Sequence, residues 1–177
     1  MKTAVFIDCG DTLIDESTQD ILRTDQGQGP LVGSADLIPG ADTLLKTLKD
    51  RGIPLALVAD GMAVSFKNIL TGHGLWDLFD AHVISEEVGV MKPEAAMFTT
   101  AAEALKIPEE EYSLVLMVGN NLSRDIKGAN RMGMKSVFLD WSPRYPSEPA
   151  DAEETPDFTI RTPLELLEVI EKIEQEY

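Results

Sequence analysis

Short apolar runs alternate with helix-like segments along the whole chain, and this alternation limits the possible folds more than any other feature. The runs are brief and continuous, as is typical of strands buried on both faces of a parallel sheet. Four are clear and the last two are weaker: Ala4–Ile7, Leu55–Val58, Leu114–Val118 and Val137–Leu139, then Val83–Ser85 and Phe158–Ile160. This order predicts the α/β fold class, as a single doubly wound, Rossmann-like parallel-sheet domain over residues 1–177.

Between these runs, apolar residues recur at the spacing of helices. In 40–51 they fall at i, i+3, i+4 and i+7, and Gly52 supplies a stop signal. The last helix has Thr162 as its expected N-cap and Glu165 three residues later, in a capping-box pattern. Further helices are predicted over 62–70, 93–105 and 123–132.

The composition excludes several classes of protein. The 177-residue chain carries 31 acidic against 15 basic residues, a net charge of −16, and has no basic run. Binding to nucleic acids or anionic membranes depends on Lys and Arg, so we expect neither as a partner. One cysteine forms no internal disulfide, and no Cys/His cluster predicts zinc. Without a recognisable targeting segment or membrane span, a cytoplasmic location is the expectation.

Polar residues follow the predicted strands, at the edge of the sheet where ligands bind in such folds. Four motifs occur in order: Asp8-Cys9-Gly10-Asp11-Thr12-Leu13, Val58-Ala59-Asp60-Gly61, Met91-Lys92-Pro93 and Gly119-Asn120-Asn121-Leu122-Ser123-Arg124-Asp125. In order and spacing they resemble the four motifs of the haloacid dehalogenase (HAD) superfamily of hydrolases. The resemblance covers about residues 1–140.

This resemblance implies a Mg²⁺-dependent phosphatase whose substrate is a phosphorylated compound of unknown identity. Asp8 is the implied nucleophile, which would form an aspartyl-phosphate. Backbone amides in the turn Cys9–Asp11 would hold phosphoryl oxygens, Gly10 included. Lys92 would neutralise the nucleophile and those oxygens, and amides of Asp60 and Gly61 are further candidates to contact phosphate.

The implied Mg²⁺ ligands are Asp8, the Gly10 carbonyl, Asn120 and Asp125. Asn120 stands where relatives have an aspartate, so it brings an amide oxygen but no charge. For Asp125 the alternative is a carboxylate in the first turn of a helix, facing the helix dipole.

The sequence departs from the family pattern in the first and second motifs as well. Gly10 stands where active relatives have the aspartate that works as general acid and base, a function worth about 10²–10⁴-fold in rate. The neighbouring Asp11 either takes over this proton transfer or stabilises the turn with Thr12. Ala59 replaces a hydroxyl side chain, and Asp60 either lies at the site or caps the helix from Met62.

Two segments are expected to be loops. Residues 13–38 are too few for a cap with its own core and read as a flap or short loop, so we expect no sizeable cap over the site. Residues 141–157 are rich in proline and acid. Within them, Trp141, Arg144 and Tyr145 either line the mouth of the site or pack on one another.

Other reactive side chains carry less weight, and two further functions stay open. Cys9 is expected to be a buried apolar side chain, and His73 and His82 have no partner that suggests a catalytic pair. The replacements at Gly10, Ala59 and Asn120 also fit a catalytically impaired binding or regulatory protein of this fold. Gly10 and Asn120 fit a dehalogenase-type hydrolase more loosely.

Overall fold

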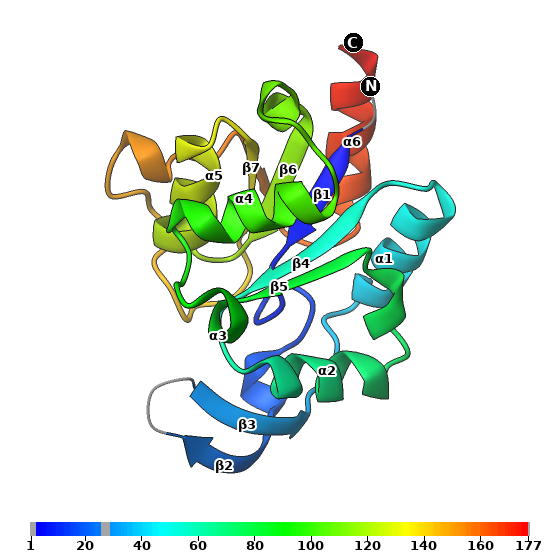
Figure 1. The fold of residues 1–177 in the computed structure, drawn as a ribbon, viewed down its shortest axis with the longest axis vertical. Coiled ribbons are helices and arrows are strands. Elements are labelled where there is room, and N and C mark those ends of the chain that lie inside the picture. The colour runs from blue at the N-terminus through cyan, green and yellow to red at the C-terminus, as the bar shows by residue number, and fades with distance from the viewer. Residues whose placement is uncertain (1–2, 26–28, 177) are drawn as a thin grey trace.

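The core of the computed structural model, which describes residues 3–25 and 29–176, is a six-stranded parallel sheet. The strands lie in the order β5-β4-β1-β6-β7-β8, so that the chain starts in the middle and builds outward in both directions (Figure 1). They are β1 Ala4–Ile7, β4 Leu55–Ala59, β5 Ala81–Ile84, β6 Val115–Gly119, β7 Lys135–Leu139 and β8 Phe158–Ile160. The predicted α/β fold class is confirmed.

Helices cover both faces of the sheet, because successive side chains in a strand point to opposite sides. On one face Val5 and Ile7 of β1 join a core built with the helices α1 Ala41–Asp50, α2 Ala63–Gly72 and α6 Glu165–Gln175. On the other face Phe6 packs with α4 Ala95–Ala104 and α5 Lys127–Arg131. Apolar residues on both sides explain why the strands read as uninterrupted hydrophobic runs.

The helices begin and end close to the predicted positions, with two local differences. The segment predicted as one helix over 123–132 starts with a π-helical turn, Leu122–Ile126, and continues as α5. The predicted N-cap of α6, Thr162, is wrong: the N-cap position is Leu164, and the Glu165 side chain accepts a hydrogen bond from the Arg161 N–H (2.7 Å) instead of from Thr162. No helix within residues 3–25 and 29–176 has the length and apolar character needed to span a membrane.

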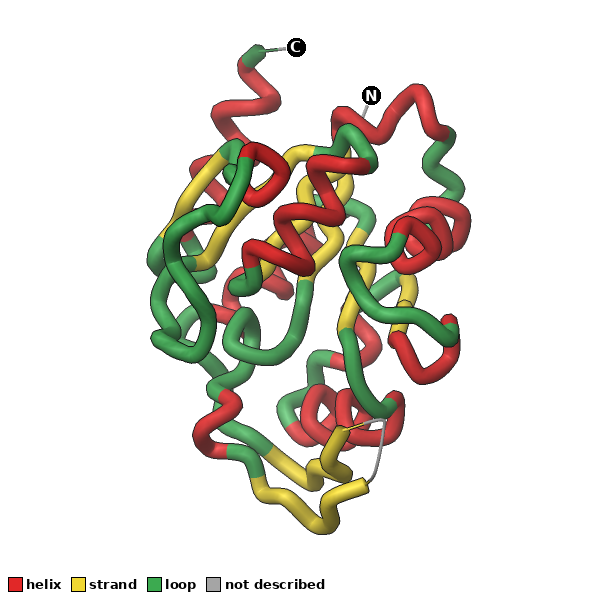
Figure 2. Tube along the Cα trace, turned by 90° about the vertical axis from the view of Figure 1, so that its left-hand side faces the viewer, coloured by secondary structure: helices red, strands yellow, loops and turns green. Residues whose placement is uncertain are grey.

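The segment expected to be a flap or loop contains a small β-hairpin. Its strands are β2 Asp20–Asp25 and β3 Gly29–Ser34, paired antiparallel with register shifts near Ile21. The hairpin projects from one end of the domain beside α2 (Figures 1 and 2). Among the described residues the insertion is a small two-stranded hairpin and not a large cap, as predicted.

Side chains of α2 anchor the hairpin. The Ser65 hydroxyl accepts a hydrogen bond from the Val32 N–H (3.0 Å) and donates one to the Pro30 carbonyl (3.0 Å). Asn68 Nδ2 donates to the Val32 carbonyl (3.1 Å). The hairpin's inner strand is therefore fixed to the helix through its backbone as well as through the buried Val32 side chain.

We expect Ser65→Ala to loosen this attachment. The variant leaves the Val32 N–H without its partner, at a cost of about 1–3 kcal/mol, which falls on the local opening of the hairpin. Amide hydrogen exchange should become faster at Val32 and stay unchanged in β1 and β6. Unchanged exchange at Val32 would show that Ser65 does not hold the hairpin.

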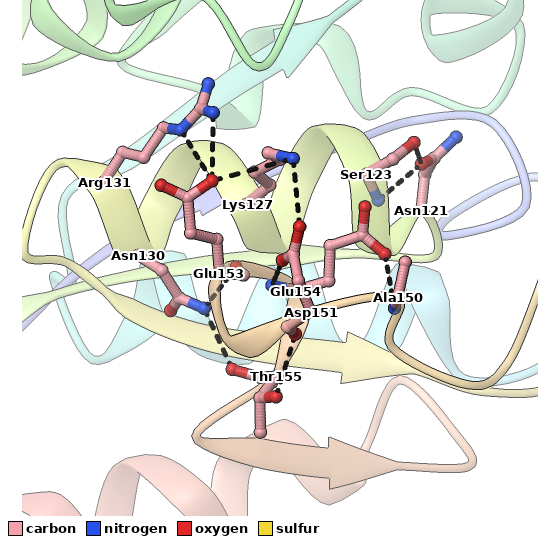
Figure 3. A network of polar contacts seen from close by, with 10 residues as sticks. All are labelled: Asn121, Ser123, Lys127, Asn130, Arg131, Ala150, Asp151, Glu153, Glu154 and Thr155. Atoms are coloured by element: carbon pink, nitrogen blue, oxygen red, sulfur yellow. Dashed lines mark hydrogen bonds and ion pairs between the residues drawn. The ribbon is translucent and has the colours of Figure 1, made fainter.

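The acidic segment 141–157 is bound to α5 by a network of polar contacts, drawn in Figure 3. Glu153 forms an ion pair with Arg131 (2.9 Å) and another with Lys127 (3.6 Å). Asn130 Nδ2 donates to the carbonyls of Glu153 (2.8 Å) and Thr155 (2.9 Å). Part of the chain's acidic excess therefore neutralises the basic side chains of this helix.

Candidate active site

The ends of the central strands surround one cavity of about 290 Å³. Asp8 follows β1, Asp60 follows β4 and Asn120 follows β6, and all three line it. The hairpin adds Gly29, Pro30 and Val32 to the wall. The motifs that are far apart in the sequence thus meet where a parallel sheet places its ligands.

Lys92 lies at the centre of this cavity's charged groups. Its Nζ is 3.0 Å from Asp8 Oδ1 and 2.7 Å from Asp125 Oδ1, and it donates to the Val58 carbonyl at 2.7 Å. Burial alone would lower the pKa of this amine, but the carboxylates of Asp125 and Asp8 outweigh burial and raise it. Lys92 is therefore a permanent cation between two carboxylates.

Asp125 is the deepest of these acids, with no exposed surface. Burial raises the pKa of its carboxyl, and the nearby Lys92 ammonium acts in the opposite direction. Its Oδ2 accepts from the Asn121 N–H (3.1 Å), and its Oδ1 lies 2.7 Å from Lys92 Nζ. Gly119 makes room for this carboxylate, because a Cβ there would overlap Asp125 Oδ2.

Asp60 supports the Lys92 backbone and does not cap α2. Its Oδ1 accepts from the Lys92 N–H (3.0 Å), and its Oδ2 lies 3.7 Å from Arg124. The N-cap position of α2 is Met62, and no side chain caps it. Burial raises the pKa of Asp60, against the Lys92 charge. The Gly61 N–H, proposed as a phosphate donor, donates instead to the Ser85 hydroxyl (2.8 Å).

Asp11 is turned into the protein and does not line the cavity. Its Oδ2 accepts from Arg144 Nε (2.6 Å) and from the Ser142 hydroxyl (2.9 Å), and its Oδ1 accepts from the Glu16 N–H (3.0 Å). Trp141 Nε1 donates to its carbonyl (2.6 Å). Oδ2 thus joins the first motif to the segment after β7, and Oδ1 joins it to the turn that begins at Glu16, which places Asp11 in a structural position.

Glu16 is a residue of the cavity wall that the sequence patterns did not single out. Its carboxylate lies over Gly10, and its Oε2 is 3.3 Å from Arg144 Nε. Burial raises the pKa of Glu16, and the Arg144 charge opposes this rise. The segment after the first motif therefore contributes a further carboxyl group to the cavity that Asp8, Asp60 and Asp125 also line.

The remaining candidates occupy structural or peripheral positions. Cys9 is fully buried in the core, and burial raises the pKa of its thiol. His73 contacts the Ala35 carbonyl (2.6 Å), and His82 stacks on Trp76 with ring centroids 3.6 Å apart. Of Trp141, Arg144 and Tyr145, for which two arrangements were open, Tyr145 lines the cavity, whereas Trp141 and Arg144 donate hydrogen bonds to Asp11.

The donor atoms at this site suit a hard cation. No group of three or more His, Cys, Asp or Glu side chains arranged for a metal occurs among the described residues. Mg²⁺ needs fewer, because it binds through one or two carboxylates plus neutral oxygens and water. Asp8 and Asp125 supply two carboxylates to the cavity wall, and Gly10 and Asn120 bring neutral oxygens to the same wall.

The α/β sheet thus brings an accessible carboxylate, a buried ammonium and a second, buried acid together at its carboxyl edge. The family model for haloacid dehalogenase-like hydrolases matches residues 10–133. The chain belongs to this family.

Individual relatives agree with this assignment. The chain is 38% identical over 138 residues to the glyceraldehyde 3-phosphate phosphatase of Methanopyrus kandleri, covering 78% of this chain and 56% of that one. The HAD phosphatase structure from Thermococcus onnurineus shares the fold, with a TM-score of 0.75, 22% identity and coverage of 96% and 98%. The magnesium-bound HAD-hydrolase YfnB of Bacillus subtilis aligns with a TM-score of 0.64 and 26% identity, covering 77% of this chain and 56% of that one. The chain spans about half the length of the curated relatives it matches.

Proposed function

We propose that this protein hydrolyses phosphate monoesters through an aspartyl-phosphate on Asp8. The observation that supports it most directly is the Asp8–Lys92–Asp125 array, in which one buried ammonium contacts both carboxylates, at 3.0 and 2.7 Å. Both acids belong to the cavity wall, but the Asp8 side chain is 15% exposed, whereas Asp125 is fully buried. Asp8 is therefore the carboxylate that a phosphoryl group can reach.

In this reaction a carboxylate oxygen of Asp8 attacks phosphorus, and the bond from phosphorus to the ester oxygen breaks. Lys92 Nζ lies 3.0 Å from Asp8 Oδ1 and balances charge that collects on the phosphoryl oxygens. Water then attacks the aspartyl-phosphate, and the bond between Asp8 and phosphorus breaks to release inorganic phosphate. Asp60 contributes by fixing the backbone of Lys92, because its Oδ1 accepts a hydrogen bond from the Lys92 N–H (3.0 Å).

Mg²⁺ fits the charge balance of the cavity. Its wall carries four carboxylates, Asp8, Glu16, Asp60 and Asp125, against the cations Lys92 and Arg124. A phosphate dianion meets net repulsion there. Asp8, Asp125, the Gly10 carbonyl and Asn120 would hold the ion, which supplies positive charge to the phosphoryl oxygens when bound.

The cavity favours a small substrate. Its volume of about 290 Å³ is at the lower end of the range for small-molecule pockets. The M. kandleri relative is a phosphatase of a three-carbon sugar phosphate. We therefore propose a small phosphorylated metabolite as the substrate class.

The test is phosphate release from 4-nitrophenyl phosphate and from a panel of small sugar and hydroxy-acid phosphates. We expect turnover with Mg²⁺, none after EDTA treatment and its return when Mg²⁺ is restored. Acid-quenched enzyme should carry one phosphoryl group that hydroxylamine removes. No release from any ester, combined with chloride release from a 2-haloacid, would replace the proposal with the dehalogenase interpretation. If neither phosphate nor chloride is released, the interpretation as a binding protein is favoured.

A further inference from the structure

The position of Glu16 bears on the catalytic group that this site lacks. Gly10 has no side chain, and a Cβ built on it would overlap Glu16 Oε1 and lie 2.8 Å from Glu16 Cδ. The carboxylate of Glu16 therefore occupies the space into which a side chain at position 10 would extend. This space lies in the wall of the cavity that also contains Asp8 and Lys92.

The chain holds Glu16 there through several contacts. Asp15 caps the 3₁₀ turn Glu16–Thr18 by accepting from the Ser17 N–H (2.9 Å). The Glu16 N–H donates to Asp11 Oδ1 (3.0 Å). Arg144 contacts Glu16 Oε2 at 3.3 Å while it also binds Asp11. One oxygen of Glu16 is thus tied to Arg144, and the other, Oε1, is the atom over Gly10.

We propose that Glu16 is the proton donor and acceptor of the phosphatase reaction, in place of a carboxylate at position 10. This inference rests on the function proposed above. It is the position of the carboxylate over Gly10, beside Asp8, that supports it. Asp11 is a poorer candidate, because both of its oxygens are occupied by Arg144, Ser142 and the Glu16 N–H.

Glu16 alone can supply and take up the proton that moves in each of the two steps, formation and hydrolysis of the aspartyl-phosphate. When the bond from phosphorus to the ester oxygen breaks, the protonated carboxyl of Glu16 gives its proton to that oxygen, and the alcohol leaves. The resulting Glu16 carboxylate then takes a proton from the water that attacks the aspartyl-phosphate. Breakage of the bond between Asp8 and phosphorus returns Asp8 as a carboxylate and Glu16 in its starting, protonated form.

The first experiment compares Glu16→Gln with the wild type on two kinds of ester. An alkyl phosphate such as glycerol phosphate needs a proton on its leaving oxygen, whereas 4-nitrophenyl phosphate does not. We expect Glu16→Gln to lower turnover of the alkyl ester by about 10²–10⁴-fold. With the aryl ester it should give a burst of nitrophenol equal to the enzyme concentration, followed by slow turnover. Glu148→Gln, an exposed acid of the segment 141–157, is the matched control and should behave as wild type.

A second experiment exchanges the two positions. Glu16→Ala empties the space over Gly10, and adding Gly10→Asp to this variant places a carboxylate there from the other side. We expect the double variant to recover much of the alkyl phosphatase activity that Glu16→Ala loses. Recovery would not follow if Glu16 only supported the fold.

The outcomes separate this inference from the proposed function. An active wild type whose Glu16→Gln variant hydrolyses both esters normally overturns the role of Glu16 and leaves the phosphatase proposal intact. Equal losses on both esters without a burst, and without recovery in the double variant, also overturn it. A wild type that hydrolyses neither ester overturns the phosphatase proposal itself, and the role of Glu16 with it.

Discussion

Asp8→Asn is expected to abolish phosphate release, with a loss on the order of 10³-fold or more, because an amide cannot form the aspartyl-phosphate. The fold should survive. The amide oxygen of the substituted side chain can still accept from Lys92, and the ion pair between Lys92 and Asp125, at 2.7 Å, remains. Initial-rate assays and circular dichroism on the same sample measure the two effects separately.

Binding of inorganic phosphate gives the control for this variant. Removing the negative charge of Asp8 removes repulsion of an anion, so affinity should stay the same or increase when Mg²⁺ is saturating for both proteins. Calorimetric titration measures it. A variant that turns over at the wild-type rate would rule out Asp8 as the nucleophile, and one that is unfolded would show that Asp8 holds the structure together.

Much of the framework was predictable from the sequence because local patterns determine it. A strand buried on both faces is apolar throughout, so the run Ala4–Ile7 could be recognised without knowing its neighbours, and it is β1 to the residue. The position of Asp8 then follows from where β1 ends. The spacing of the motifs predicted that Lys92 and Asp125 belong to the same site. In the structure Lys92 Nζ lies 3.0 Å from Asp8 and 2.7 Å from Asp125.

The parts that were missed depend on contacts between distant segments. The hairpin strands have a weak apolar alternation, and Ile21 and Leu22 of β2 are exposed, so their pairing relies on α2 through Ser65 and Asn68. Asp60 resembles a helix cap by its place before α2, yet it accepts from the amide of Lys92, 32 residues away. No local pattern contains such information.

The same reason explains the first motif. The order Gly10-Asp11 draws attention to Asp11 as the nearest acid, but its left-handed backbone (φ 49°) belongs to a turn whose carboxylate faces Arg144, 133 residues later. Glu16 reaches the space over Gly10 only because that turn folds back. The only signal at this position in the sequence was the absence of a side chain at Gly10, which does not indicate which distant group lies over it.

Lys92→Met is expected to be the most damaging substitution to stability. Lys92 is 3% exposed and is the cation that contacts both Asp8 and Asp125. Removing it leaves the fully buried Asp125 with an uncompensated charge, which costs about 3–5 kcal/mol in free energy of unfolding. Urea denaturation followed by tryptophan fluorescence measures this loss. Phosphatase activity should fall as well, since the phosphoryl oxygens lose their balancing charge.

A second substitution separates charge from packing. In Lys92→Met/Asp125→Asn the stranded negative charge is gone, so stability should return in large part, because replacing a whole buried pair costs far less than removing one partner. Activity should not return, because the double variant lacks both the ammonium and a carboxylate of the site. If the double variant is as unstable as Lys92→Met, the loss comes from packing around the Lys92 side chain. In that case the electrostatic account of this array is wrong.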